Sequence, residues 1–306
     1  MRFIVPSLVL TFAFGNYAAL AQSVEIAKSG NSYQISIDRK PVARFVVSDP
    51  KILRPYFAEV RAPNGIQVTR NHPPKDKDAT DHDSMHPGIW MGFGDLGGSD
   101  FWRNKGSVRT EVLDEKRTDC ISARNQYLDG KKPICEEVFH VQIRIVPAGY
   151  LLLLDSTFQS ATPFAFGDQE EMGLGIRVAT PLTVKNGGEI LNSDGRKNEK
   201  ETWGKAADWC AYGGKIDGKA VGMAIYPHPD NFRKSWFHAR DYGLLVANPF
   251  GQKAFTRGEA SKFVVRKDEP FRLRFGILIF GSDTERPPDF DKVYKDYLQF
   301  AKDERK

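Results

Sequence analysis

The chain is poor in cysteine, and several common catalytic and ligand-binding motifs are missing from it. Its 3 cysteines form no Cys-x-x-Cys pair, so a thiolate zinc site is unsupported. No Gly-x-Ser-x-Gly elbow, phosphate-binding loop or dinucleotide fingerprint occurs. The 44 Lys and Arg residues are scattered, with no basic run that alternates with aromatic residues, which argues against a nucleic-acid partner.

Long apolar runs are also scarce, and the one that matters for membrane insertion or export lies near the start of the chain. Arg2 precedes the largely apolar segment 3–14, and Ala19-Leu20-Ala21 supplies a small-x-small cleavage pattern. We therefore predict an export signal over residues 1–21 and a periplasmic or secreted mature chain starting at Gln22. A retained membrane anchor is the alternative, but the run is short for a span. After signal removal we expect no integral membrane segment.

Export would permit a disulfide. Cys120 and Cys135 could close the polar segment 119–132, leaving Cys210 over. The neighbours of Cys210, Trp209 and Tyr212, favour burial of its thiol rather than reactivity.

Alternating polar and apolar residues predict many strands, separated by turns that contain Asn-Gly and Asp-Gly. Only the tail, at about 289–302, has apolar residues at helical spacing. We therefore predict one all-β domain over 22–306, a large antiparallel sandwich with a C-terminal helix. The expected strands are 32–37, 44–47, 139–146, 150–158, 174–179, 218–226, 243–247, 261–265 and 271–280.

Residues 70–85 are polar and rich in proline and aspartate, which predicts a long surface loop. Such loops in compact domains are usually functional or disordered. His82 and His86 are spaced i, i+4 near several aspartates, but outside a helix this spacing does not make a metal site. Calcium held by the aspartates is an alternative to a solvated loop. We predict no metal and no cofactor.

The segment from His86 to Trp102 is the most informative part of the chain. It sets two Trp, two Phe, one His and two Asp among five Gly, a composition that excludes a stable helix. Aromatic rings can stack on the C–H faces of a sugar while carboxylates bind its hydroxyls. The alternative is a glycine-kinked pair of core strands with buried aromatic side chains.

Several blocks in a fixed order resemble the bacterial family DUF6807, often labelled "methane oxygenase PmoA". They are 54–57, 81–90, 94–102, 167–177, 222–231, Trp236 and 241–243. The resemblance implies a secreted β-sandwich protein of sugar-degrading bacteria, with a mutarotase-like supersandwich as a possible fold. Many relatives have a histidine-rich loop, whereas this chain has Asp83-Ser84-Met85 and Pro87. A methane monooxygenase subunit is excluded, because that membrane protein needs several spanning helices and this chain has a mean hydropathy of −0.45.

Acid–base chemistry on a sugar needs a proton donor and an acceptor placed around one ring. We predict that His86 and His228 transfer protons, with Glu171 as their carboxylate partner. Arg177 would orient the substrate, or simply pair with Glu171. The remaining predicted substrate-binding residues are Trp90, Asp95, Asp100, Trp102, Asn231 and Trp236.

These features predict a carbohydrate-active protein with a sugar or glycan as its partner. The leading hypothesis is a glycoside-cleaving hydrolase or lyase, or an epimerase, because titratable residues recur in four blocks. The alternatives are a non-catalytic carbohydrate-binding module and an envelope protein whose blocks are only core. The sugar, the linkage, the reaction type and the oligomeric state stay open. The enzymatic hypothesis requires that the blocks meet in space.

Overall fold

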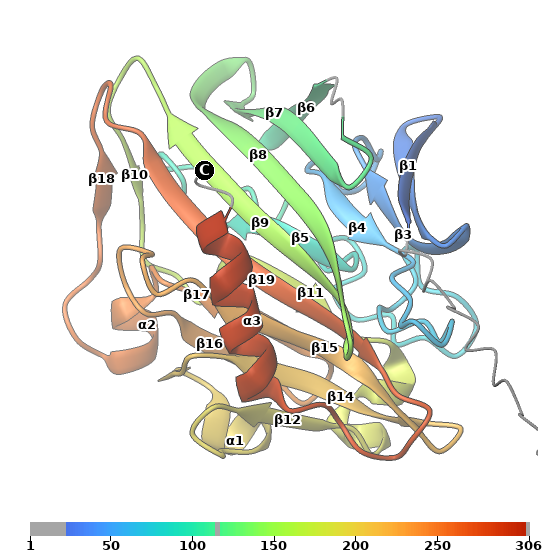
Figure 1. Ribbon diagram of the computed structural model, residues 1–306. Helices are drawn as coiled ribbons and strands as arrows, with labels where there is room; N and C mark the ends of the chain where they lie inside the picture. The colour runs from blue at the N-terminus through green and yellow to red at the C-terminus, as the bar shows by residue number, and fades with distance from the viewer. Residues whose placement is uncertain (1–22, 114–116, 304–306) are drawn as a thin grey trace, which may run out of the picture.

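Two large antiparallel sheets pack face to face in the computed structural model, which describes residues 23–113 and 117–303 (Figure 1). The predicted export signal lies outside the described residues. One sheet has nine strands in the order β1 (Val24–Ser29), β2 (Ser32–Ile37), β3 (Lys40–Val46), β4 (Tyr56–Ala58), β5 (Ile89–Phe93), β11 (Met172–Arg177), β17 (Leu244–Asn248), β16 (Trp236–Arg240) and β13 (Lys205–Ala206). The other has eight, in the order β12 (Glu189–Asn192), β14 (Cys210–Ile216), β15 (Lys219–Pro227), β19 (Phe271–Gly281), β9 (Gly149–Gln159), β8 (Lys132–Val146), β7 (Cys120–Asp129) and β6 (Ser107–Leu113). A two-stranded ribbon of β10 (Phe164–Phe166) and β18 (Phe263–Val265) flanks them.

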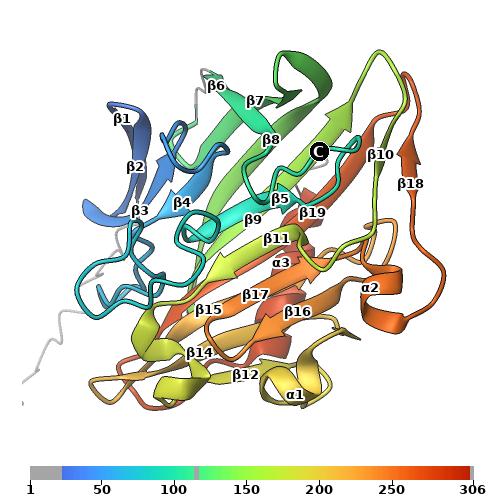
Figure 2. The same ribbon diagram turned by 180° about the vertical axis from the view of Figure 1, so that it is seen from behind.

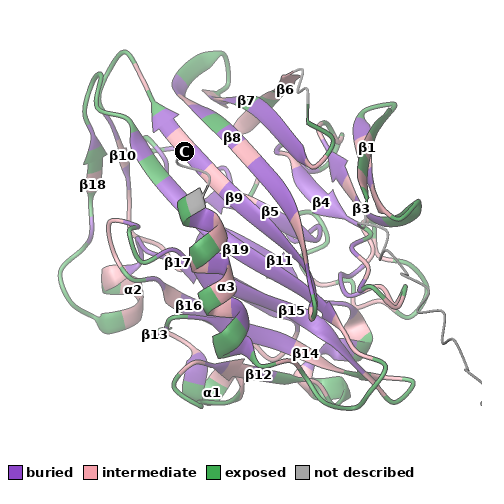
Figure 3. Ribbon diagram, in the orientation of Figure 1, coloured by how far each residue is buried: buried purple, intermediate pink, exposed green. Residues whose placement is uncertain are grey.

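The main core lies between the two sheets because alternate residues of each strand point inward. On β11, Leu174 and Ile176 join this core, and on β19, Ile277 and Ile279 do the same. The central strands are buried along their length (Figure 3). The predicted antiparallel all-β sandwich is therefore confirmed.

Helix α3 (Phe290–Asp303), which the tail pattern predicts, lies on the outer face of the eight-stranded sheet over its central strands β9, β15 and β19 (Figure 1). Val293 and Tyr297 of this helix pack in one cluster with Tyr226 and Leu278 of the sheet. Apolar residues that recur at helical spacing thus give α3 one buried face. No helix among the described residues is long and apolar enough to cross a membrane.

The outer face of the nine-stranded sheet is covered differently. Irregular chain over residues 70–85 lies at one side of β11, β17 and β16, and the short helices α1 (Asn198–Thr202) and α2 (Gln252–Thr256) lie at the other (Figure 2). Two single 3-10 turns, η1 (Thr180–Leu182) and η2 (Val184–Asn186), follow β11. On this face β11 carries Arg177, and β16 carries His238 and Arg240.

The disulfide prediction is wrong. Segment 119–132 is not an excursion but mostly strand β7, which pairs with β8 so that Cys120 lies opposite Gln142 and Cys135 opposite Tyr127. Positions 120 and 127 are about 23 Å apart along a strand, whereas a disulfide needs Cα atoms within about 7 Å. All three cysteines are buried thiols.

We therefore expect a reducing agent to shift the Tm by less than about 1 °C, because there is no disulfide to reduce. If Cys120 and Cys135 were bonded, a disulfide of this loop length would contribute about 3 kcal/mol, and its reduction would lower the Tm by more than about 1 °C. Thermal melts with and without reductant test this. Thiol titration of the unfolded, unreduced protein should find every cysteine reactive, and a deficit of two thiols would contradict it.

Candidate active site on the nine-stranded sheet

Three of the predicted site residues meet on the outer face of β5. The His86 ring stacks on Trp90 at a centroid distance of 5.2 Å and meets Trp102 edge-on at 5.7 Å. Trp102 Nε1 donates to His86 Nε2 over 3.3 Å. All three side chains are buried, His86 completely. Burial lowers the pKa of His86 well below its usual value, so its imidazole is neutral. Its ring packs between those of Trp90 and His82.

The glycines of this region make room for the indoles. A Cβ on Gly175 of β11 would come within 2.8 Å of the Trp90 ring, and one on Gly92 would lie 3.1 Å from both indoles. The sheet can carry two tryptophans here only because the adjacent positions lack side chains. The alternative interpretation of segment 86–102, a glycine-kinked strand with buried aromatic residues, thus describes Trp90 and Trp102.

An imidazole that sequence reasoning did not select lies on top of this cluster. The His82 ring stacks on His86 at 4.9 Å and on Tyr242 at 5.3 Å, with interplanar angles of 14° and 13°. Its side chain is 38% exposed, in contrast to the buried His86. His82 is therefore the histidine of this cluster that a ligand can reach.

A carboxylate orients His82. Asp81 Oδ2 lies 3.0 Å from His82 Nδ1, and Arg177 Nη2 donates to Asp81 Oδ1 over 2.8 Å. Partial burial acts to raise the pKa of Asp81, but the hydrogen bonds from Arg177 and His82 and the charge of Arg70 bring it below its ordinary value. An ionised carboxylate accepts the proton of Nδ1, which leaves Nε2 of His82 as a base.

Buried arginines hold the loop that carries this dyad. Arg70 donates to the carbonyl oxygens of Ala79, Asp81 and His86, over 2.9, 2.6 and 3.1 Å. Arg177, which we expected to clamp a substrate or pair with Glu171, instead pairs with Asp81 and lies 4.7 Å from the Tyr242 ring centroid. Its role in this structure is to position Asp81.

A second polar network lies on β16 of the same face. Arg240 donates to Glu199 over 2.8 Å, to Glu170 over 3.3 Å and, through Nε, to His238 Nε2 over 2.9 Å. His238 Nδ1 lies 3.1 Å from the Glu170 carbonyl oxygen. Burial, together with the Arg240 charge, lowers the pKa of His238 to about 4, so it is a neutral acceptor. Glu170 remains 39% exposed and offers a carboxylate to a ligand.

The predicted carboxylates are mostly engaged in local structure. Glu171 is ion-paired with Arg103. Asp100 accepts from the backbone N–H groups of Trp102 and Arg103 over 3.1 and 2.9 Å, which closes the turn after β5. Asp95 accepts from Gly98 and lines a separate groove of about 860 Å³ beside the β10–β18 ribbon. Glu171 and Asp100 thus meet through Arg103, whereas Asp95 faces elsewhere.

His228 and Asn231 lie on the opposite outer face, next to α3. The His228 ring meets Tyr297 edge-on at 5.9 Å, and Asn231 exchanges hydrogen bonds of 2.9 and 2.8 Å with the backbone of Arg274. The two sheets and the core between them separate His228 from His86. The expected acid–base pair of His86 and His228 around one sugar is therefore not supported by the structure.

The fold and this site define an antiparallel β-sandwich protein with an imidazole–carboxylate dyad and a carboxylate–arginine network on one outer sheet face. The chain belongs to the family of unknown function DUF6807, which it matches over residues 32–292. No curated protein matches it. Within the described residues no group of three or more His, Cys, Asp or Glu side chains could hold a metal ion.

Several solved structures show weak similarity. A galactose mutarotase related enzyme from Lactobacillus acidophilus is 10% identical, with 87% of this chain and 100% of that chain covered and a TM-score of 0.41. A galactose mutarotase-like protein from Lactobacillus casei is 9% identical over 85% and 100% of the two chains, with a TM-score of 0.37. A putative kojibiose phosphorylase from the human microbiome is 6% identical over 85% of this chain and 29% of that one, also at 0.37.

Proposed function

We propose that the protein is a carbohydrate-active enzyme whose reacting sugar lies beside the exposed part of His82, with His82 as the proton-transfer residue. The observation that carries this is the exposed His82 imidazole, oriented by an ionised Asp81 that Arg177 holds in turn. A base oriented by a third group is the arrangement expected of general acid–base catalysis.

A proton-transfer reaction on a sugar suits these residues best. In an elimination, His82 Nε2 would accept the proton of a sugar carbon while the C–O bond at the neighbouring carbon breaks and the leaving oxygen takes a proton from water. In an epimerisation, the carbon would instead regain a proton from water on its opposite face. In both, Asp81 would stabilise the imidazolium that forms. Glu170, partly exposed and bonded to Arg240, is a further carboxylate on this face that a ligand can reach. Glycoside hydrolysis remains the rival chemistry, since it too needs an acid and a base.

A non-catalytic carbohydrate-binding module is the second candidate. It is favoured by the structural engagement of Glu171, Asp100 and His228, which leaves few free acids and bases. A binder would need the aromatic side chains of this face but would not need the dyad.

A glycan panel separates the two functions. Purified 22–306 is incubated with neutral, acidic and 3-keto glycosides, and products and binding are both measured, with the His82→Ala variant alongside. Turnover by the wild type alone supports the enzyme. Binding by both proteins without any product supports the module, and neither binding nor turnover contradicts both.

We also propose that the protein is exported, on the strength of the first 21 residues of the sequence. When the full chain is expressed in a bacterium, the periplasmic or secreted fraction should contain protein that begins at Gln22. N-terminal sequencing measures this, and an intact Met1 on membrane-bound protein would contradict it.

A further inference from the structure

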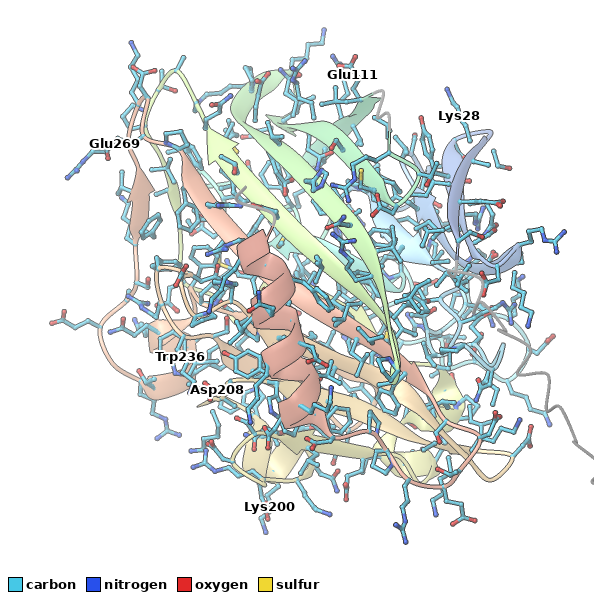
Figure 4. All side chains as sticks on the ribbon, viewed as in Figure 1. Lys28, Glu111, Lys200, Asp208, Trp236 and Glu269 are labelled. Carbon is cyan, nitrogen blue, oxygen red and sulfur yellow. The ribbon has the colours of Figure 1, made fainter. Side chains whose placement is uncertain are left out.

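Three aromatic side chains gather on the far side of the Arg240 network from the dyad. Trp203 follows α1 and Phe255 belongs to α2. Trp236, labelled in Figure 4, begins β16. The Phe255 ring lies 5.4 Å from Trp203 and 6.3 Å from Trp236 between centroids. All three are partly exposed, unlike Trp90 and Trp102. We call these three residues the aromatic platform.

Carboxylates fix both helices that carry the platform. Glu199 of α1 accepts from the backbone N–H of Asp241 over 2.9 Å, while Asp241 accepts from the N–H of Glu199 over 2.9 Å. Asp168 accepts from the N–H groups of Lys253 and Ala254 in α2 over 2.8 and 3.1 Å. These clamps hold the rings of Trp203 and Phe255 in place before any ligand arrives, which reduces the entropy cost of binding.

The platform also has charged donors beside it. The Arg233 guanidinium lies 5.5 Å from the Trp236 centroid, and that of Arg240 lies 5.8 Å from Trp203. Aromatic surface offers contact to the C–H face of a sugar, and the flanking N–H groups offer hydrogen bonds to its hydroxyls. Arg240 connects this arrangement directly to Glu170.

The distance between the Asp81–His82 dyad and the aromatic platform exceeds the length of one sugar ring. Trp236 lies on β16, whereas Arg177, which holds Asp81, lies on β11, and β17 runs between these strands. Two strand spacings are about 10 Å. Arg177 is level with Arg240, and Trp236 lies four residues further along β16, which adds about 13 Å along the strand and makes the separation about 16 Å. A ligand that reaches both the dyad and the aromatic platform must therefore contain more than one sugar unit.

We propose that the aromatic platform is a second sugar-binding subsite and that the substrate is an oligosaccharide, with one unit at His82 and a more distant unit of the same chain at Trp203 and Trp236. This inference rests on the proposed function of the dyad and adds its substrate class. It assigns Trp203 and Trp236 a binding role without any part in proton transfer.

Chain-length dependence tests it. We expect Trp203→Ala and Trp236→Ala each to raise KM or Kd for a glycan of three or more units about tenfold, with kcat within about twofold. The same variants should bind or process the matching single-unit glycoside like the wild type. Tyr294→Ala, which removes a half-buried aromatic residue of α3 on the opposite face, is the control and should change neither value.

The outcomes separate the subsite from the dyad. Equal effects of the Trp variants on short and long glycans, or no effect on either, would overturn the subsite. Trp203→Phe should recover most of the lost affinity, which excludes misfolding as the cause. If the Trp variants act as expected but His82→Ala keeps full turnover, the subsite stands and the proposed role of His82 fails. Absence of binding to every oligosaccharide overturns both.

Discussion

The His82→Ala variant should lose about 10² to 10⁴ in kcat on the glycan that the wild type converts, with KM within about threefold. The reason is that His82 is the exposed imidazole of the cluster and has an ionised carboxylate at Nδ1. Removal of the ring abolishes proton transfer but leaves the aromatic platform and the Arg240 network intact. Steady-state kinetics at neutral pH measure the effect.

Two comparisons make this result specific. Asp81→Asn should also lower kcat, because an amide stabilises the imidazolium less well than a carboxylate does. His140→Ala removes a histidine of β8 on the other sheet, which bonds to Ser122, and should leave kinetics unchanged. Wild-type kcat in His82→Ala would show that the dyad is not the catalytic group.

The largest stability effect is expected at Arg54. This buried side chain donates to the carbonyl oxygens of Met85, Phe101 and Trp102 and to Asn104 Oδ1. Arg54→Met would leave these acceptors without their donor, which should lower the free energy of unfolding by about 3–5 kcal/mol. The corresponding fall in Tm is about 10 °C. Urea or guanidinium denaturation followed by tryptophan fluorescence measures it.

Arg124→Met is the matched control. Arg124 is exposed on β7 and lies 3.9 Å from Glu111, so its replacement should change the free energy of unfolding by less than about 1 kcal/mol. An Arg54→Met protein as stable as this control would contradict the proposed anchoring of segment 85–104. The comparison also assigns the block at 54–57 to structure rather than to substrate contact.

Local patterns predicted most of the fold. Alternation at 32–37 corresponds to β2, the more continuously apolar run at 150–158 corresponds to β9, and helical spacing in the tail corresponds to α3. The prediction failed at β7, where polar residues were taken for a loop. Ser122 and Asn125 of this strand are in fact buried, because His140 and Glu137 of neighbouring β8 satisfy them. Cross-strand partners of this kind are invisible to a pattern of hydropathy.

The candidate site was less predictable than the fold. Residue type alone made His86 and His228 equivalent candidates, but which face of which sheet each occupies depends on strand order. Conversely, His82 was not selected, because an i, i+4 spacing with His86 places two side chains on one face only in a helix, and this segment is a loop. In the structure the rings of His82 and His86 are nevertheless neighbours, because they stack on each other. Only three-dimensional packing distinguishes the buried ring from the exposed one.

We propose that a sugar binds on the outer face of the nine-stranded sheet, between residues 70–85 and helices α1 and α2. A crystal structure of His82→Ala with a glycan identified in the panel tests it most directly. We predict one sugar unit beside His82 and another unit of the same chain on Trp203 and Trp236. A glycan bound beneath α3 near His228, or in the groove lined by Asp95, would contradict it.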